Sequence, residues 1–140
     1  NRKKFKVILF DIGIHQHLSG LNLSQHLILD NLELINKGSS AEIFAGLELI
    51  KSNPAYKPSQ LYYWHREARS SNAEIDYIIE KERQIIPVEV KASTKGAMQS
   101  MHLFLKTRNL IKGIRLSHEN YNKYDKIEVI PLYAAINILM

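Results

Sequence analysis

The stretch AEIDYIIEKERQIIPVEVKAS, residues 73–93, decides the fold of this chain. It holds two runs, 73–80 and 85–92, in which apolar residues recur at alternate positions. Alternation of period two is typical of half-buried strands, and the short polar interval between the runs predicts a tight turn. A turn centred on Glu82-Arg83 pairs residues whose numbers sum to 165. The stretch therefore predicts an antiparallel hairpin with a defined register.

This register sorts the side chains of the hairpin onto two faces, because successive residues of a strand point to opposite sides. One face is expected to be apolar, with Ile75 opposite Val90, Tyr77 opposite Val88 and Ile79 opposite Ile86. On the other face Asp76 is expected directly opposite Glu89, and Lys91 shares that face. Two carboxylates facing each other across strands repel. The hairpin therefore carries a feature that needs a chemical or structural reason.

The sequence around the hairpin predicts further elements of both kinds. Residues 60–67 predict a strand that extends the meander, and residues 39–52 and 95–110 predict helices. Residues 112–117 and 126–133 predict two more strands, and the crossover after residue 93 places the first of them parallel to the strand before it. The expected fold class is α/β, with a central mixed sheet of an antiparallel meander plus a parallel strand, flanked by helices.

The chain is expected to form a single domain of 140 residues. Residues 1–37 are expected to supply a strand over 5–11 and helices within 12–36, with Gly38 closing the segment, and to lead in from an upstream region because the chain opens on Asn1. Residues 38–117 form the expected core. Residues 118–140 supply a C-terminal strand and tail.

Composition excludes several classes of protein. The chain has no cysteine, which rules out disulfides, thiolate metal sites and a cysteine nucleophile. The absence of cysteine fits a cytoplasmic protein, which is the expected location. The sequence holds no apolar run long enough for a membrane span. Its net charge is +5, with a pI near 9.4. A basic balance favours a polyanionic partner such as nucleic acid.

The expected pairing of Asp76 with Glu89 has two interpretations. A divalent cation between them would remove the repulsion, and hard oxygen ligands suit Mg²⁺ or Mn²⁺ better than zinc. Alternatively, Lys91 neutralises the pair, or solvent screens it. A further acid, Glu42, is carried by the helix that must pack on the sheet. It too has an alternative role, because Ser39 and Glu42 have the spacing of a helix capping box.

The ordered motifs resemble a known superfamily. Gly38-x-x-x-Glu42, Ala73–Tyr77 and Pro87–Lys91 look like the acid-bearing helix, the D motif and the E-x-K motif of the PD-(D/E)XK nucleases. Nearly the whole chain is similar to the uncharacterised domain, domain of unknown function 4143, that follows the AAA-type ATPase core of many bacterial and archaeal ATPases. The resemblance rests also on KVILFDIG, LYYWHRE and SMHLFL. It implies a restriction-endonuclease-like core.

The resemblance also implies roles for individual residues. Asp76 and Glu89 would bind Mg²⁺ or Mn²⁺, with the Val90 carbonyl as a further ligand and Glu42 as an outer or shared one. Lys91 would orient the attacking water or stabilise charge that grows on the phosphate. The implied activity is metal-assisted hydrolysis of phosphodiester bonds in nucleic acid, DNA being favoured. Asp76, Glu89, Lys91 and Glu42 are thus the expected catalytic residues.

Other residues carry weaker hypotheses. Gln99 resembles an accessory polar residue of the superfamily. His15 and His17 cannot share a helical face and are expected to be structural. His65 and His102 are within conceivable reach of the site, and several basic residues are candidate phosphate contacts or solvated surface: Arg66, Arg69, Lys95, Lys106 and Arg108. Tyr62, Tyr63 and Trp64 are expected in the strand core rather than as a platform for bases.

Two other functions stay open at the level of sequence. In the first, the domain is a non-catalytic module that binds DNA, a protein partner or its own ATPase core. In the second, its sheet serves only for the assembly of oligomers. The chain contains no nucleotide-binding loop of the G-x-x-x-x-G-K-[ST] type, so any ATPase activity is expected in an upstream region of the same polypeptide.

Overall fold

The computed structural model describes residues 5–20, 37–54, 56, 58–67, 72–93 and 97–139. Its core is a six-stranded mixed sheet in the order β1-β2-β3-β4-β6-β5. The strands are β1 (Tyr62–Arg66), β2 (Ala73–Lys81), β3 (Gln84–Lys91), β4 (Gly113–Ser117), β5 (Asn122–Tyr124) and β6 (Ile127–Pro131). The helices are α1 (Ile12–Leu18), α3 (Lys37–Lys51) and α4 (Gln99–Thr107), followed by the 3-10 helix η1 (Leu132–Ile138). The fold is α/β, as the sequence predicts.

The predicted meander and crossover are both present. β1 pairs with β2 and β2 with β3 in antiparallel fashion, whereas β3 pairs with β4 in parallel through the crossover that contains α4. β4 pairs in parallel with β6 as well. The hairpin turn holds Glu82 and Arg83 at φ 54° and 62°. Its register matches the predicted sum, because Tyr77 pairs with Val88 and Lys81 with Gln84.

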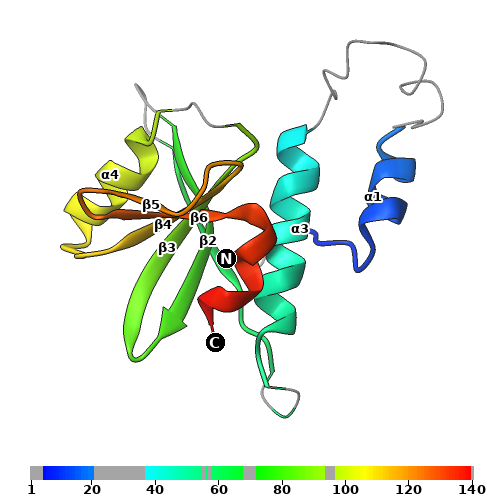
Figure 1. The fold of residues 1–140 in the computed structure, drawn as a ribbon, viewed down its shortest axis with the longest axis horizontal. Helices are drawn as coiled ribbons and strands as arrows, with labels where there is room; N and C mark the ends of the chain where they lie inside the picture. Colours follow the sequence, from blue (N-terminus) through cyan, green and yellow to red (C-terminus); the bar gives the residue numbers. More distant parts are fainter. Residues whose placement is uncertain are drawn as a thin grey trace.

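The two faces of the sheet are covered by different helices (Figure 1). α3 packs with η1 on one face, over a core to which β2, β3 and β4 contribute Tyr77, Val88 and Leu116. α4 packs on the other face, where Met101, Phe104 and Leu105 meet Ile75 and Ile127. Apolar alternation on central strands and apolar stripes on the helices account for this three-layer arrangement.

A β-bulge in β2 separates Ile75 from Tyr77, which the uninterrupted register placed on one face. Trp64 of β1 pairs with Ile75 and Tyr62 pairs with Ile78, and the register shifts between them. Two residues of β2, Asp76 and Tyr77, therefore face Tyr63 alone. An extra residue reverses the alternation of side chains along a strand. As a result Ile75 joins the α4 core and Tyr77 joins the α3 core.

The N-terminal part departs from prediction. Residues 5–10 form no strand of the described sheet; they run as an extended segment beside α3, with Phe5, Val7 and Phe10 largely exposed. A strand was predicted because the segment is rich in apolar residues, but these residues form no ladder, and only some of them are buried. α1 forms within the region 12–36 that was predicted to be helical, and it ends at a turn at Ser19-Gly20. Gly38 does not close the segment, since it lies inside α3; the helical stretch predicted within 21–36 lies outside the described residues.

The C-terminal part contains one strand that was not predicted. β5 forms a short hairpin with β6 inside the polar stretch 118–125, where every side chain of the strand is exposed. Without buried apolar residues, β5 leaves no alternating pattern to detect. The apolar tail folds as η1 and buries Ala135 and Ile138 against α3. Among the described helices, none has the length and apolar character to cross a bilayer.

Candidate active site

Three carboxylates meet where α3 approaches the bulge of β2. Glu42 of α3 and Glu74 and Asp76 of β2 each offer an oxygen, and these oxygens lie within 4.8 Å of one another. Glu42 and Asp76 are two of the four residues expected at the site. Glu74 was not among them, although it precedes Asp76 by two positions. This group of Glu42, Glu74 and Asp76 is called the carboxylate cluster below.

The position of Glu42 is set by close packing between α3 and β2. Tyr77 Oη donates a 2.8 Å hydrogen bond to the Glu42 carbonyl oxygen. The ring can approach because residue 46 is glycine: a Cβ there would lie 2.6 Å from Tyr77 Oη. The predicted capping box is wrong, because α3 begins before Ser39 and the Ser39 hydroxyl lies 3.3 Å from His15 Nε2. The Glu42 side chain is therefore free of a capping role.

Asp76 is held by the backbone of β3. Its Oδ2 accepts a 2.8 Å hydrogen bond from the Val90 N–H. The paired residues of β2 and β3 extend from Tyr77–Val88 to Lys81–Gln84, so the expected backbone pairing of Asp76 with Glu89 is not formed. The bulge explains the difference, because an extra residue disrupts the backbone ladder locally. The Asp76 carboxylate, instead of a backbone carbonyl of β2, accepts the hydrogen bond from the Val90 N–H.

Glu89 and Lys91 lie beside the carboxylate cluster rather than in it. Lys91 Nζ lies 2.7 Å from Glu89 Oε1, and the Glu89 side chain is only 8% exposed. Its other oxygen, Oε2, is buried without a hydrogen-bond partner. A buried carboxylate oxygen without a donor is costly. Of the two sequence interpretations, neutralisation by Lys91 therefore accounts for one oxygen of Glu89 and leaves the other to be explained.

The electrostatics link Glu89 to the carboxylate cluster. Burial raises the pKa of Glu89, with further increases from the charges of Asp76 and Glu74, while Lys91 opposes the shift. Burial likewise raises the pKa of Glu42, with the charge of Asp76 adding to it and Lys6 opposing it. The charge of Asp76 therefore raises the pKa of both Glu89 and Glu42. Like charges gathered in a partly buried place favour a proton or a cation there.

A lysine that sequence reasoning missed lies among these acids. Lys6 Nζ forms an ion pair and hydrogen bond with Glu42, and lies 3.6 Å from both Glu74 Oε1 and Asp76 Oδ1. Burial lowers the pKa of Lys6, but the hydrogen bond and charge of Glu42, followed by Asp76, outweigh burial and raise it overall. The signal in the sequence was a single basic residue between Phe5 and Val7 in a segment taken for a buried strand.

A comparison with models of protein families identifies the family of this chain. Residues 37–135 match the family model described as Domain of unknown function (DUF4143). The chain belongs to this family. No curated protein matches the chain, and no solved structure does. The matched span contains α3 and all six strands, so the carboxylate cluster, Glu89 and Lys91 all lie within the DUF4143 domain, whereas Lys6 precedes it.

In this DUF4143 domain, the described residues among the weaker candidates lie on β1 and on or next to α4. His65 pairs with Glu74 across β1 and β2, whereas His102 is exposed on α4. Gln99 is exposed at the start of α4, next to Ser100, whose Oγ accepts a 3.4 Å hydrogen bond from the Glu74 N–H. Arg66, Lys106 and Arg108 are exposed, and Arg69 and Lys95 lie outside the described residues.

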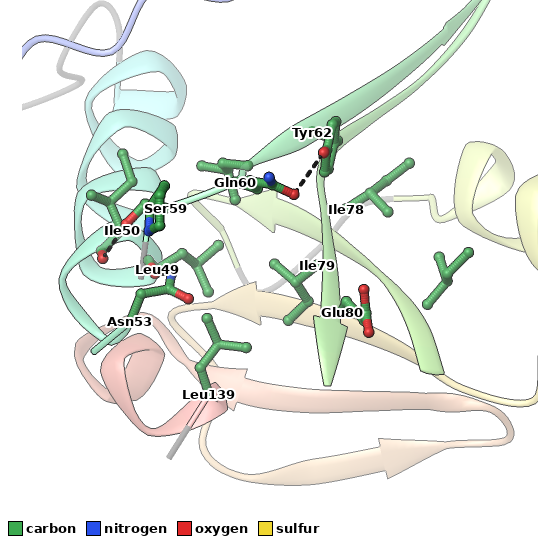
Figure 2. Close-up of a pocket in the computed structure, with 13 residues that line it drawn as sticks. Leu49, Ile50, Asn53, Ser59, Gln60, Tyr62, Ile78, Ile79, Glu80 and Leu139 are labelled. Atoms are coloured by element: carbon green, nitrogen blue, oxygen red, sulfur yellow. Dashed lines mark hydrogen bonds between the residues drawn. The ribbon is translucent and has the colours of Figure 1, made fainter. Parts of the chain in front are cut away.

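The aromatic residues of β1 divide between core and surface. Trp64 packs edge-on against Phe104 of α4, with ring centroids 5.0 Å apart, so it is core as expected. Tyr62 differs from expectation, because it is 58% exposed at the strand end. It borders an apolar pocket of about 370 Å³ between the end of α3 and the β2–β3 hairpin (Figure 2). That pocket contains none of the carboxylate cluster, so it is separate from the acid site.

Proposed function

We propose that this DUF4143 domain is a metal-dependent, nuclease-like domain of PD-(D/E)XK type that hydrolyses phosphodiester bonds of nucleic acid. The observation that carries the proposal is the convergence of Glu42, Glu74 and Asp76 within 4.8 Å, next to the Glu89–Lys91 pair on the neighbouring strand. The mixed α/β sheet fits a restriction-endonuclease-like core. DNA is the favoured substrate, and an AAA-type ATPase core upstream in a cytoplasmic polypeptide is the proposed context.

The donor atoms fit a divalent cation. Carboxylate oxygens are the ligands that Mg²⁺ and Mn²⁺ prefer, and the cluster offers three of them without sulfur or imidazole. The buried Glu89 Oε2 has no hydrogen-bond partner, and coordination to a cation would compensate for that absence. Asp76 and Glu89 would hold the metal with Glu42 as a shared ligand, Glu74 joins them as an addition to the expected set, and the Val90 carbonyl remains a proposed ligand.

The chain's own residues have separable tasks in this proposal. A bound Mg²⁺ or Mn²⁺ supplies a more acidic water and charge compensation. Lys91, held 2.7 Å from Glu89, keeps a fixed cation beside the cluster, where it stabilises charge that develops on a phosphate. The Val90 N–H holds Asp76 in place through its 2.8 Å hydrogen bond. The net charge of +5 favours approach of a polyanion.

The test is DNA cleavage with matched variants. The chain is incubated with supercoiled and single-stranded DNA in Mn²⁺, Mg²⁺ or EDTA. We expect metal-dependent cleavage that falls about 100-fold or more in Asp76→Ala and Lys91→Ala. Glu80→Ala is the control, because Glu80 is an exposed acid of the same strand outside the cluster. Absence of cleavage with every metal and both substrates would refute the catalytic proposal.

A second candidate is a non-catalytic module that binds DNA or a protein. The observation that favours it is Lys6, because the chain itself already places a cation among the three carboxylates. The two candidates separate in one experiment. A binding module retains DNA affinity in Asp76→Asn and never cleaves, whereas a nuclease loses cleavage in that variant.

A further inference from the structure

The N-terminal segment, residues 5–10, lies against the acid site without belonging to the sheet. Its side chains alternate: Phe5 and Val7 are exposed, while Lys6 and Ile8 are partly buried. Ile8 packs against the core cluster beneath α3. In Figure 1 the segment that leads into α1 runs beside α3, and α1 stands on the side of α3 away from the sheet. The segment thus delivers one charged side chain to the carboxylate cluster.

The ammonium of Lys6 takes the position that suits a cation. It forms an ion pair with Glu42, lies 3.6 Å from an oxygen of Glu74 and of Asp76, and donates a 3.4 Å hydrogen bond to the Asp76 carbonyl oxygen. Its Nζ also lies 5.1 Å from the centre of the Tyr77 ring, a cation–π distance. These contacts come from α3 and β2 together. Lys6 therefore neutralises the same oxygens that a divalent cation needs.

We propose that Lys6 competes with the divalent cation for the carboxylate cluster, so that metal loading requires the N-terminal segment to withdraw. The inference rests on the metal site of the proposed function and adds its regulation. The competition is steric as well as electrostatic, because the cluster oxygens lie within 4.8 Å of one another and the ammonium is within 3.6 Å of all three residues. The structure then represents the metal-excluding state of the domain.

The attachment of the segment suits reversible withdrawal. Residues 5–10 form none of the described ladder pairs, and Phe5 and Val7 gain little from burial. A cavity of about 370 Å³ separates part of the segment from β1, with Phe5, Lys6 and Ile8 on one side and Tyr62 and Tyr63 on the other. Segments with few buried apolar contacts open more readily than the core. Withdrawal of Lys6 and Ile8 therefore leaves the sheet intact.

The first test measures Mn²⁺ affinity by titration calorimetry on the full chain. If Lys6 occupies the cluster in about 90% of molecules, metal binding is weakened about tenfold. We expect Lys6→Met to bind Mn²⁺ about tenfold more tightly than wild type, and Lys6→Arg to stay near wild type. Lys123→Met is the matched control for the loss of one positive charge, because Lys123 is exposed on β5 at the other edge of the sheet.

The outcomes distinguish the competition by Lys6 from the metal site of the proposed function. Equal Mn²⁺ affinity in wild type and Lys6→Met, with affinity lost in Asp76→Asn, overturns the competition and leaves the metal site of the proposed function standing. Equal gains in Lys6→Met and Lys123→Met also overturn it, because total charge would explain both. Mn²⁺ binding in none of the variants overturns the metal site together with the competition.

A second measurement uses the wild-type chain and does not depend on the folding of a variant. Trypsin cleaves after lysine, so cleavage after Lys6 reports withdrawal of the segment. We expect Mn²⁺ to raise the rate of cleavage after Lys6 severalfold relative to cleavage after the exposed Lys123, and to have no such effect in Asp76→Asn. An unchanged or lower rate after Lys6 at saturating Mn²⁺ overturns the proposal.

Discussion

Replacement of Asp76 by alanine or by asparagine separates the two roles that the structure gives this side chain. Asp76 belongs to the carboxylate cluster, and its Oδ2 also accepts the Val90 N–H at 2.8 Å. Alanine removes the charge and the acceptor, whereas asparagine removes the charge and keeps an oxygen of the same reach. The difference in stability between the two variants therefore measures the hydrogen bond to Val90.

The expected magnitude follows from burial. Val90 is 9% exposed, so its N–H is left without an acceptor in Asp76→Ala. An unsatisfied buried donor costs about 1–3 kcal/mol, and we take about 2 kcal/mol. Unfolding entropy of about 2.1 cal/mol/K per residue over the 140 residues gives about 0.3 kcal/mol/K, so Tm falls by about 7 °C.

Asparagine is expected to be nearly neutral. It loses an ion pair with a half-buried Lys6 that is worth about 0–1 kcal/mol, and it relieves repulsion from Glu42 and Glu74. The assay is urea unfolding in EDTA, followed by tryptophan fluorescence and supported by Tm. The reasoning is refuted if Asp76→Ala is as stable as Asp76→Asn, or if asparagine is the more damaging change.

Three further predictions concern stability in EDTA. Glu82→Asn combined with Arg83→Gly should raise the free energy of unfolding by about 1 kcal/mol, because both residues have positive φ in a two-residue turn; no gain in urea unfolding would contradict this. Gly46→Ala should cost about 1–3 kcal/mol by the same assay, since the added Cβ would lie 2.6 Å from Tyr77 Oη; full stability would contradict the close approach. The pKa of Glu89 is raised in the folded chain, so protonation of Glu89 favours folding. The Tm of wild type minus the Tm of Glu89→Gln should therefore fall as pH rises from 4.5 through the raised pKa of Glu89; an increase in this difference would contradict that sign.

The hairpin could be predicted because its signal is local. Alternation in 73–80 and 85–92 and a polar turn at Glu82-Arg83 are properties of adjacent residues, and they fixed the register from Tyr77 to Lys81 correctly. The bulge could not be predicted in the same way. It depends on how β1 pairs with the other side of β2, and no property of Asp76 or Tyr77 alone shows that they face a single residue.

The candidate site shows the same division. Glu42 and Asp76 were brought together correctly, since the helix that carries Glu42 had to bury its apolar face on the sheet. Glu74 was passed over because the expected repulsion involved only Asp76 and Glu89, although alternation places Glu74 on the same face of β2 as Asp76. Lys6 was missed because its segment was assigned to a strand, and a strand assignment predicts a partner strand rather than an ionic contact.

The long sequence separations within the site have a kinetic consequence. Lys6 and Asp76 are 70 positions apart, and Glu42 and Tyr77 are 35 apart. Contacts of this kind form late, because closing long loops is slow and must precede them. A ligand of the finished site therefore finds nothing to bind in the early stages of folding. Divalent cations that bind here would lengthen the lifetime of the native chain by slowing its unfolding, and would leave the rate of folding almost unchanged.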